Sequence, residues 1–321
     1  MKANAQMKSY DVIGDIHGHA DKLEALLSKM GYVPAGLSYK APAGRQAVFV
    51  GDFIDRGPKQ MRVLDIARAM VDAGDAMAVM GNHEFNAIGF VTRSKEHPEE
   101  FLRPNSDKKR SQHHEFLAQV GDGSTAHREW VEWFRSLPLF LDLGGIRVVH
   151  GCWNDLAVAE VSKGYWGASG RRMSDEFLFG SHVKGSALLG ARKLLTCGVE
   201  WDLPDGLHID GKGGEKHKEV RIANWRHWAK QLREVAMVPS GNAENVPDIE
   251  IPGHIPMAPI EGAPIFVGHH WFSGKPAIET PKFACLDYSA AKDGPLVAYR
   301  WDGESELSND KLIWAGGSGA V

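Results

Sequence analysis

The sequence is poor in cysteine, has no long apolar run and carries no excess of positive charge. Its three cysteines are an odd number without CxxC spacing, which indicates neither a disulfide framework nor a cysteine zinc site. No stretch approaches the roughly 18 consecutive apolar residues of a membrane-spanning helix, and residues 1–10 lack the apolar core of a signal peptide. We therefore expect a cytoplasmic protein without a membrane partner.

Charge and composition exclude further classes of protein. Lys and Arg number 37 against 41 Asp and Glu, so the net charge of -4 argues against duplex nucleic acid as a partner. Hydrophobic residues at 43% and charged residues at 24% are close to the averages for globular proteins, which excludes disorder, collagen and coiled coil. The 15 histidines are numerous for such a chain, and several follow apolar runs.

Five short apolar runs are each followed by a glycine beside Asp, Asn or His. Apolar residues at helical spacing follow the first two runs, over 23–30 and 63–70. The pattern predicts a mostly buried sheet with polar side chains along the edge where the loops leave it, and this edge is the candidate active site. The runs are residues 10–13, 47–50, 77–80, 146–149 and 264–267.

Other segments predict a hairpin and two insertions. Residues 283–287 and 296–301 flank a turn-rich Asp-Gly-Pro and predict a β-hairpin. Residues 93–127 are charged and contain a basic cluster at 108–110, and residues 239–264 hold six prolines. We expect residues 1–321 to form a single domain, with 93–127 and 239–264 as insertions.

Three motifs place acidic, amide and imidazole side chains directly after the first three predicted strands. They are GDIHG at 14–18, GDFIDRG at 51–57 and GNHE at 81–84. In the first motif, a carboxylate and an imidazole two residues apart can turn toward the same divalent cation. The three motifs together therefore predict a metal site.

In this order the motifs resemble those of the calcineurin-like metallophosphoesterases, and in particular their phosphoprotein-phosphatase branch, which carries GDxHG, GDxxDRG and GNHE. His150 and His269 resemble the two remaining histidine sites of the family. Residues 285–288 and 295–299 resemble the closing hairpin of bacterial diadenosine tetraphosphatase-like phosphatases. The resemblance implies an α/β fold, a four-layer α/β/β/α sandwich with a dinuclear metal site at the strand ends.

The resemblance also implies the ligands of two divalent metal ions, with Mn²⁺ favoured and Fe, Zn, Ni or Co left open by the ligand types. Asp15 and His17 would bind one metal, and Asp52 would bridge both, since a carboxylate has two oxygens. A hydroxide shared by two such metals would then attack phosphorus in line. The second site would be completed by Asn82, His150 and His269.

Further residues match the family's substrate machinery. His83 matches the general acid that protonates the leaving group, and Asp55 matches the carboxylate that orients it, because a neighbouring anion favours the imidazolium. Arg56 matches the phosphate-binding arginine, whose planar fork suits two phosphoryl oxygens. Either Arg221 or Arg226 is expected to act as a second phosphate-binding arginine, and we favour Arg221.

The chain departs from the family pattern after His269. Many members have another metal-binding histidine two residues later, where this chain has Trp271. Neighbouring side chains on an extended segment point in opposite directions, so His270 is a poorer ligand candidate than His269. The remaining histidines, His113 among them, match no family position, and surface or structural roles are expected for them.

The resemblance implies a metal-dependent phosphoesterase, and we favour a phosphomonoesterase or nucleotide phosphatase. The expected substrate is a phosphorylated small molecule, a nucleotide or a phosphoprotein. Hydrolysis of a diadenosine polyphosphate or of an RNA-end phosphodiester is an alternative, which basic side chains projecting from 93–127 into the site would favour. Two further alternatives are a protein phosphatase acting on phosphoserine or phosphothreonine, and a non-catalytic metal-binding module.

Overall fold

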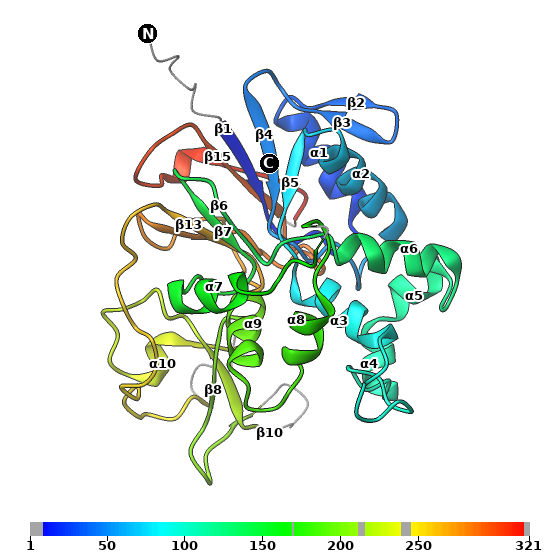
Figure 1. Ribbon diagram of the computed structural model, residues 1–321. Coiled ribbons are helices and arrows are strands. Elements are labelled where there is room, and N and C mark those ends of the chain that lie inside the picture. Colours follow the sequence, from blue (N-terminus) through cyan, green and yellow to red (C-terminus); the bar gives the residue numbers. More distant parts are fainter. Residues whose placement is uncertain (1–8, 169, 211–215, 239–244, 318–321) are drawn as a thin grey trace.

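The computed structural model describes residues 9–168, 170–210, 216–238 and 245–317, and two β-sheets form its centre (Figure 1). In the first sheet β1, β4 and β5 are parallel, while β15 is antiparallel to both β1 and β16. Its strands, in spatial order, are β16 (Leu312–Ala315), β15 (Leu296–Trp301), β1 (Ser9–Ile13), β4 (Arg45–Phe49) and β5 (Ala76–Ala78).

The second sheet packs face to face on the first. Along β1 and β4, Val12 and Val48 face the second sheet, whereas Ile13 and Phe49 face the helices, as the twofold period of a strand requires. The rings of Phe266 and Tyr299 are 5.1 Å apart across the interface. The strands of the second sheet, in spatial order, are β14 (Phe283–Cys285), β13 (Ile265–Val267), β7 (Arg147–Val149) and β6 (Phe140–Asp142).

Helices cover the outer faces of both sheets, so the expected four-layer α/β/β/α arrangement is confirmed (Figure 1). α1 (Ala20–Lys29) and α2 (Gln60–Asp72) pack on the first sheet through the apolar positions that the helical spacing predicted. Val161 of α7 and Leu195 of α9 belong to the apolar cluster on the outer face of the second sheet. The remaining helices are α3 (Asn82–Val91), α4 (Asp107–Gln112), α5 (His114–Val120), α6 (Thr125–Phe134), α7 (Asp155–Ser162), α8 (Asp175–Gly180), α9 (Ala187–Cys197), α10 (Leu232–Val235) and the 3₁₀ turn Asn309–Lys311.

Three small sheets lie outside this sandwich. They are β2 (Val33–Ala35) with β3 (Ser38–Lys40), β8 (Val199–Asp202) with β11 (Glu219–Ile222) and β12 (Ala236–Met237), and β9 (Ile209–Asp210) with β10 (Lys216–His217). The segment 93–127 contains α4, α5 and the start of α6. Of the segment 239–264, residues 239–244 lie outside the described residues, and 245–264 are largely irregular backbone.

The predicted β-hairpin at 283–301 is wrong. β14 runs parallel to β13 in the second sheet, whereas β15 lies in the first sheet between β1 and β16. The turn at Asp293 to Pro295 therefore leads from one sheet to the other. The composition of a segment can predict that it forms a strand, but it does not specify which strand of which sheet it pairs with.

The carboxyl ends of the parallel strands meet at one edge of the sandwich. β1, β4 and β5 end there from the first sheet, and β7 and β13 end there from the second. All five predicted loops leave from this edge. Among the described residues, none of the helices has the length and apolar character that crossing a bilayer requires.

Candidate metal centre

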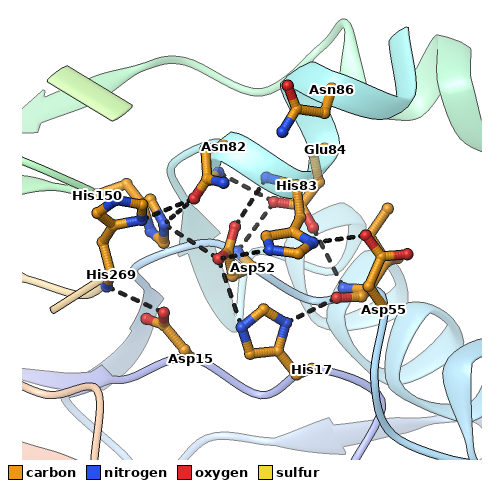
Figure 2. Close-up of polar contacts among 12 residues, drawn as sticks. Asp15, His17, Asp52, Asp55, Asn82, His83, Glu84, Asn86, His150 and His269 are labelled. Carbon is orange, nitrogen blue, oxygen red and sulfur yellow. Dashed lines mark hydrogen bonds and ion pairs between the residues drawn. The ribbon is translucent and has the colours of Figure 1, made fainter. Parts of the chain in front are cut away.

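The six predicted metal ligands lie together where these strands end (Figure 2). The loops of the first sheet contribute four of the side chains and those of the second sheet contribute two. Residues that are far apart in the chain thus share one small volume. In chain order they are Asp15, His17, Asp52, Asn82, His150 and His269.

Asp52 lies at the centre of this group. Its Oδ2 is 3.5 Å from Nε2 of His17 and 3.3 Å from Nε2 of His150. Two sets of side chains, His17–Asp52–His83 and Asp52–His150–His269, each offer ligand atoms that lie within 4.8 Å of one another. Because Asp52 belongs to both sets, the two sets could hold two neighbouring cations that share one carboxylate.

Asn82 and Asp15 contribute further oxygens. Oδ1 of Asn82 is 3.1 Å from Nε2 of His150 and 2.8 Å from Nδ1 of His269. One oxygen of Asp15 accepts the backbone N–H of His269 at 3.0 Å. Its other oxygen is buried and has no hydrogen-bond partner within the described ranges. A buried polar atom without a partner is costly, and a cation would satisfy it.

Two of the imidazoles are oriented as metal ligands are. Nδ1 of His17 is 2.8 Å from the carbonyl oxygen of Ile54, and Nδ1 of His150 is 2.7 Å from that of Val50. A carbonyl only accepts, so each Nδ1 donates and each Nε2 faces Asp52. Metal-binding histidines commonly hold their second nitrogen in this way.

The electrostatics also favour cations. Burial raises the pKa of Asp15 well above its usual range, and the nearby carboxylate of Asp287 raises it further. Burial lowers the pKa of His17 to about 3, which keeps the ring in the neutral form that binds metals. At His150 burial is outweighed by Asp52 and Asp15, which raise the pKa to about 10. A metal binding there would displace a proton, and the residues present fit a pair of divalent cations.

The backbone of the site is held in unusual conformations. His17, Asp52 and His269 have φ angles of 45°, 52° and 65°, in the left-handed region. Such residues cost roughly 1–3 kcal/mol each and persist where the surroundings hold them. Two glycines let their backbone lie against the carboxylates of the site. A Cβ on Gly81 would lie 2.1 Å from Oδ1 of Asp52, and one on Gly268 would lie 2.0 Å from Oδ1 of Asp15.

Glu84, which the sequence analysis left without a role, fixes the Asp52 loop. Its buried carboxylate accepts backbone N–H groups from Asp52 at 2.9 Å and Phe53 at 2.8 Å. It also accepts those of Ile54 at 3.3 Å and Gly81 at 3.0 Å. One side chain thus ties the loop after β4 to the start of α3. The only sequence signal for it was its place in GNHE.

The predicted acid and its partner are in direct contact. Nδ1 of His83 is 2.5 Å from Oδ2 of Asp55, and the other oxygen of Asp55 is 2.6 Å from Nδ1 of His113. Burial raises the pKa of Asp55, but the hydrogen bonds from His113 and His83 lower it to about 2. Burial lowers the pKa of His83, but Asp52 and Asp55 outweigh it and raise the pKa. His113 is buried and was not expected at the site.

A family model described as calcineurin-like phosphoesterase matches residues 9–291, a range that includes all six predicted metal ligands as well as His83, Asp55 and Glu84. The chain belongs to the calcineurin-like phosphoesterase family. Membership implies a dinuclear divalent metal site, and the Asp and His groups around Asp52 are the residues that could hold it. Which of them ligate metal remains a prediction.

Curated relatives match the chain over part of their length. A bis(5'-nucleosyl)-tetraphosphatase PrpE from Oceanobacillus iheyensis is 32% identical over 139 residues, which are 43% of this chain and 53% of that protein. The protein of the same name from Halalkalibacterium halodurans is 45% identical over 74 residues, 23% of this chain and 30% of that protein. The chain thus spans about half the length of the first relative and less of the second. The solved structure of a protein serine/threonine phosphatase from Saccharomyces cerevisiae is 16% identical in sequence and has a TM-score of 0.44. The match covers 99% of this chain and 82% of the yeast chain.

A cavity of about 760 Å³ opens over this cluster of Asp and His side chains. The exposed Arg56 lines it, and so does Arg221, whose Nη1 donates to the carbonyl oxygen of His269 at 2.9 Å. Arg226 instead pairs with Glu279 at 3.0 Å, away from this cavity. Arg221 therefore lies on this cavity and Arg226 does not, and the role of Arg221 in binding phosphate stays a prediction.

Asp287 is another side chain of the cavity that the sequence analysis did not place there. Its carboxylate accepts the backbone N–H groups of Trp271 at 2.7 Å and Ser289 at 2.9 Å. It was assigned to a hairpin, and only the correct position of β14 brings it beside Asp15. His270, in agreement with the prediction, points away and contacts the carbonyl oxygen of Gly151 at 3.2 Å.

Replacement of Gly81 by alanine is expected to weaken metal binding. The added Cβ would displace the Asp52 carboxylate, and loss of such supporting geometry typically lowers metal affinity by about 10–100-fold. Calorimetric titration of metal-free Gly81→Ala with Mn²⁺ measures the change. Gly190→Ala is the matched control, because Gly190 is an exposed helical glycine whose Cβ would meet no described atom outside its own helix backbone within 4 Å. Equal Mn²⁺ affinities in the two variants would contradict the prediction.

Proposed function

We propose that this phosphoesterase-family protein is a divalent-metal-dependent phosphoester hydrolase, a phosphomonoesterase or nucleotide phosphatase. The observation that carries the proposal is that two sets of candidate metal ligands share Asp52 beside the His83–Asp55 pair. Asp15, His17 and Asp52 would hold one metal, and Asp52 would hold the second together with Asn82, His150 and His269. We further propose one such domain over residues 1–321, with 93–127 and 239–264 inserted.

The ligand set is of nitrogen and oxygen only, which suits Mn²⁺, our first choice, as well as Fe, Zn, Ni and Co. When bound, a pair of such cations polarises a phosphoryl group and makes water a better nucleophile. Arg56 and Arg221 would bind the phosphoryl oxygens through their guanidinium groups. Their position on the cavity beside the Asp and His cluster supports this role.

His83 would donate a proton to the oxygen that leaves. Asp55 holds its Nδ1, so Nε2 is the nitrogen left to act, and this atom lies 3.9 Å from Oδ2 of Asp52. Asp52 and Asp55 raise the pKa of His83, which favours the protonated form that an acid needs. Attack and protonation would then occur on opposite sides of the phosphorus.

The experiment that tests the proposal is an assay of metal-free protein restored with each of the five metals. The substrates are an alkyl phosphate, a phosphodiester, a dinucleoside polyphosphate and a phosphoserine peptide. We expect hydrolysis of the alkyl phosphate, fastest with Mn²⁺. Absence of hydrolysis with every metal and substrate would favour a non-catalytic metal-binding module and overturn the proposal.

His83→Asn is expected to lower kcat for the alkyl phosphate by about 100-fold or more, because general acid catalysis contributes on that scale. The loss for p-nitrophenyl phosphate should be smaller, since its phenolate leaves without a proton. Steady-state kinetics on both esters measure the difference, with exposed His97→Asn as control. Near-normal turnover of the alkyl phosphate by His83→Asn would remove the acid assignment.

We propose a second candidate, hydrolysis of a nucleotide with a longer phosphate chain, on the basis of two cations from the segment 93–127. Arg103 and Lys109 both line the cavity, and burial lowers the pKa of each. Arg103 donates to Asn86 at 2.5 Å, and neither cation has a carboxylate ion pair among the residues described. Arg110, in contrast, pairs with Asp122 outside the cavity. Relatives named bis(5'-nucleosyl)-tetraphosphatases agree with this candidate.

If these cations bind additional phosphates, Lys109→Ala should raise KM for a dinucleoside polyphosphate by about tenfold, the scale of a lost charged hydrogen bond. KM for a simple alkyl phosphate should change little. Lys108→Ala is the matched control, because Lys108 is the exposed neighbour on the same helix. The same change in KM for both substrates would argue against the second candidate.

A further inference from the structure

Among the residues that the structure describes, His113 makes one polar side-chain contact, and it is to the carboxylate that holds the predicted acid. The residue lies between α4 and α5, 58 positions from Asp55, and its Nδ1 is 2.6 Å from Oδ1 of Asp55. Oδ2 of the same carboxylate accepts from His83 at 2.5 Å. A carboxylate only accepts hydrogen bonds, so both imidazoles donate through Nδ1. Each oxygen of Asp55 therefore has its own histidine.

Packing alone does not explain an imidazole at position 113. The ring lies between Phe90 and Phe116, with centroid distances of 5.3 Å and 5.1 Å, and only 6% of the residue is exposed. Its Nε2 is buried without a hydrogen-bond partner in the part of the chain that the structure describes. Leaving a buried polar atom unpaired is unfavourable, and phenylalanine would fill the same space without that disadvantage. Phenylalanine, however, could not donate the hydrogen bond to Asp55 that His113 makes.

The helix that follows His113 is also fastened to the Asp55 loop. Gln119 of α5 accepts the backbone N–H of Gln60 at 2.8 Å and donates to the carbonyl oxygen of Pro58 at 3.0 Å. Gln60 in turn accepts the backbone N–H of Asp55 at 2.7 Å. This loop includes Asp55 and Arg56 at φ angles of 70° and 71°, which need support from their surroundings. The segment 93–127 therefore contacts the Asp55 loop in two ways, through the side chain of Asp55 and through the loop backbone.

We propose that His113 is a positioning residue that acts through Asp55 on His83, an inference that rests on the proposed phosphoester hydrolysis. With a single hydrogen bond, the Asp55 carboxylate is free to rotate about its Cβ–Cγ bond. With a donor on each oxygen, its plane is fixed, and so is the direction in which His83 presents Nε2. Catalytic groups lose activity when such supporting contacts are removed.

Two variants separate this role from packing. His113→Phe keeps the aromatic packing but has no donor, whereas His113→Asn places an amide N–H where Nδ1 was. We expect His113→Phe to lower kcat for an alkyl phosphate by about tenfold, with unchanged KM and little loss for p-nitrophenyl phosphate. His113→Asn should restore kcat to within about twofold of the original.

A spectroscopic measurement tests the same contact without metal or activity. Protein labelled with ¹⁵N-histidine and freed of metal should show downfield Nδ1–H signals for His83 and His113, because both are in short hydrogen bonds to a carboxylate. His113→Asn should lose one signal and keep that of His83. In His113→Phe the His83 signal should shift or broaden.

His127→Phe is the matched control, because His127 is also buried against Phe116 but does not contact Asp55. Its kcat and its His83 signal should equal those of the unchanged protein at a comparable Tm. An unchanged His83 signal in His113→Phe, or equal loss of kcat for both esters, would overturn the proposal. Absence of hydrolysis by the unchanged protein would refute the proposed function instead, while the NMR signals would still decide whether His113 orients His83.

Discussion

The structure depends on one buried carboxylate, that of Asp52, which faces imidazoles from both sheets. His17 and His83 approach it from the first sheet and His150 from the second, all within 3.9 Å of Oδ2. In water such a group would be solvated, but here only protein or a cation can stabilise it. The surrounding loops fix the position of this carboxylate. Asp52 has a left-handed backbone conformation, and its backbone N–H donates to the carboxylate of Glu84. The candidate metal ligands of the two sheets thus meet at this one carboxylate.

The sequence predicted which polar side chains would lie together at the strand ends, because each follows a recognisable apolar run. Strand ends in an α/β fold converge on one edge, so residues as distant as Asp15 and His269 could be placed together. The prediction of a hairpin at 283–301 was wrong because extended segments on either side of turn residues do not specify which strands pair. That error also hid Asp287, whose place at the site depends on β14 lying beside β13.

His113 could not be found in the same way. It lies in a charged segment without a strand pattern, and only the packing of α5 against the loop of Asp55 brings it to the site. The same segment supplies Arg103 and Lys109 to the cavity. The segment 93–127 thus contributes to the proposed site in two ways: His113 contacts Asp55, which holds the proposed acid, and Arg103 and Lys109 line the cavity.

The central claim is that two cations share Asp52, and calorimetric titration of the metal-free protein with Mn²⁺ tests it most directly. The account predicts two equivalents for the unchanged protein and weakened binding of both in Asp52→Asn, whose amide bridges cations poorly. The variant must keep its Tm in the absence of metal. A single equivalent in the unchanged protein, or one full-affinity equivalent retained in Asp52→Asn, would contradict a shared carboxylate.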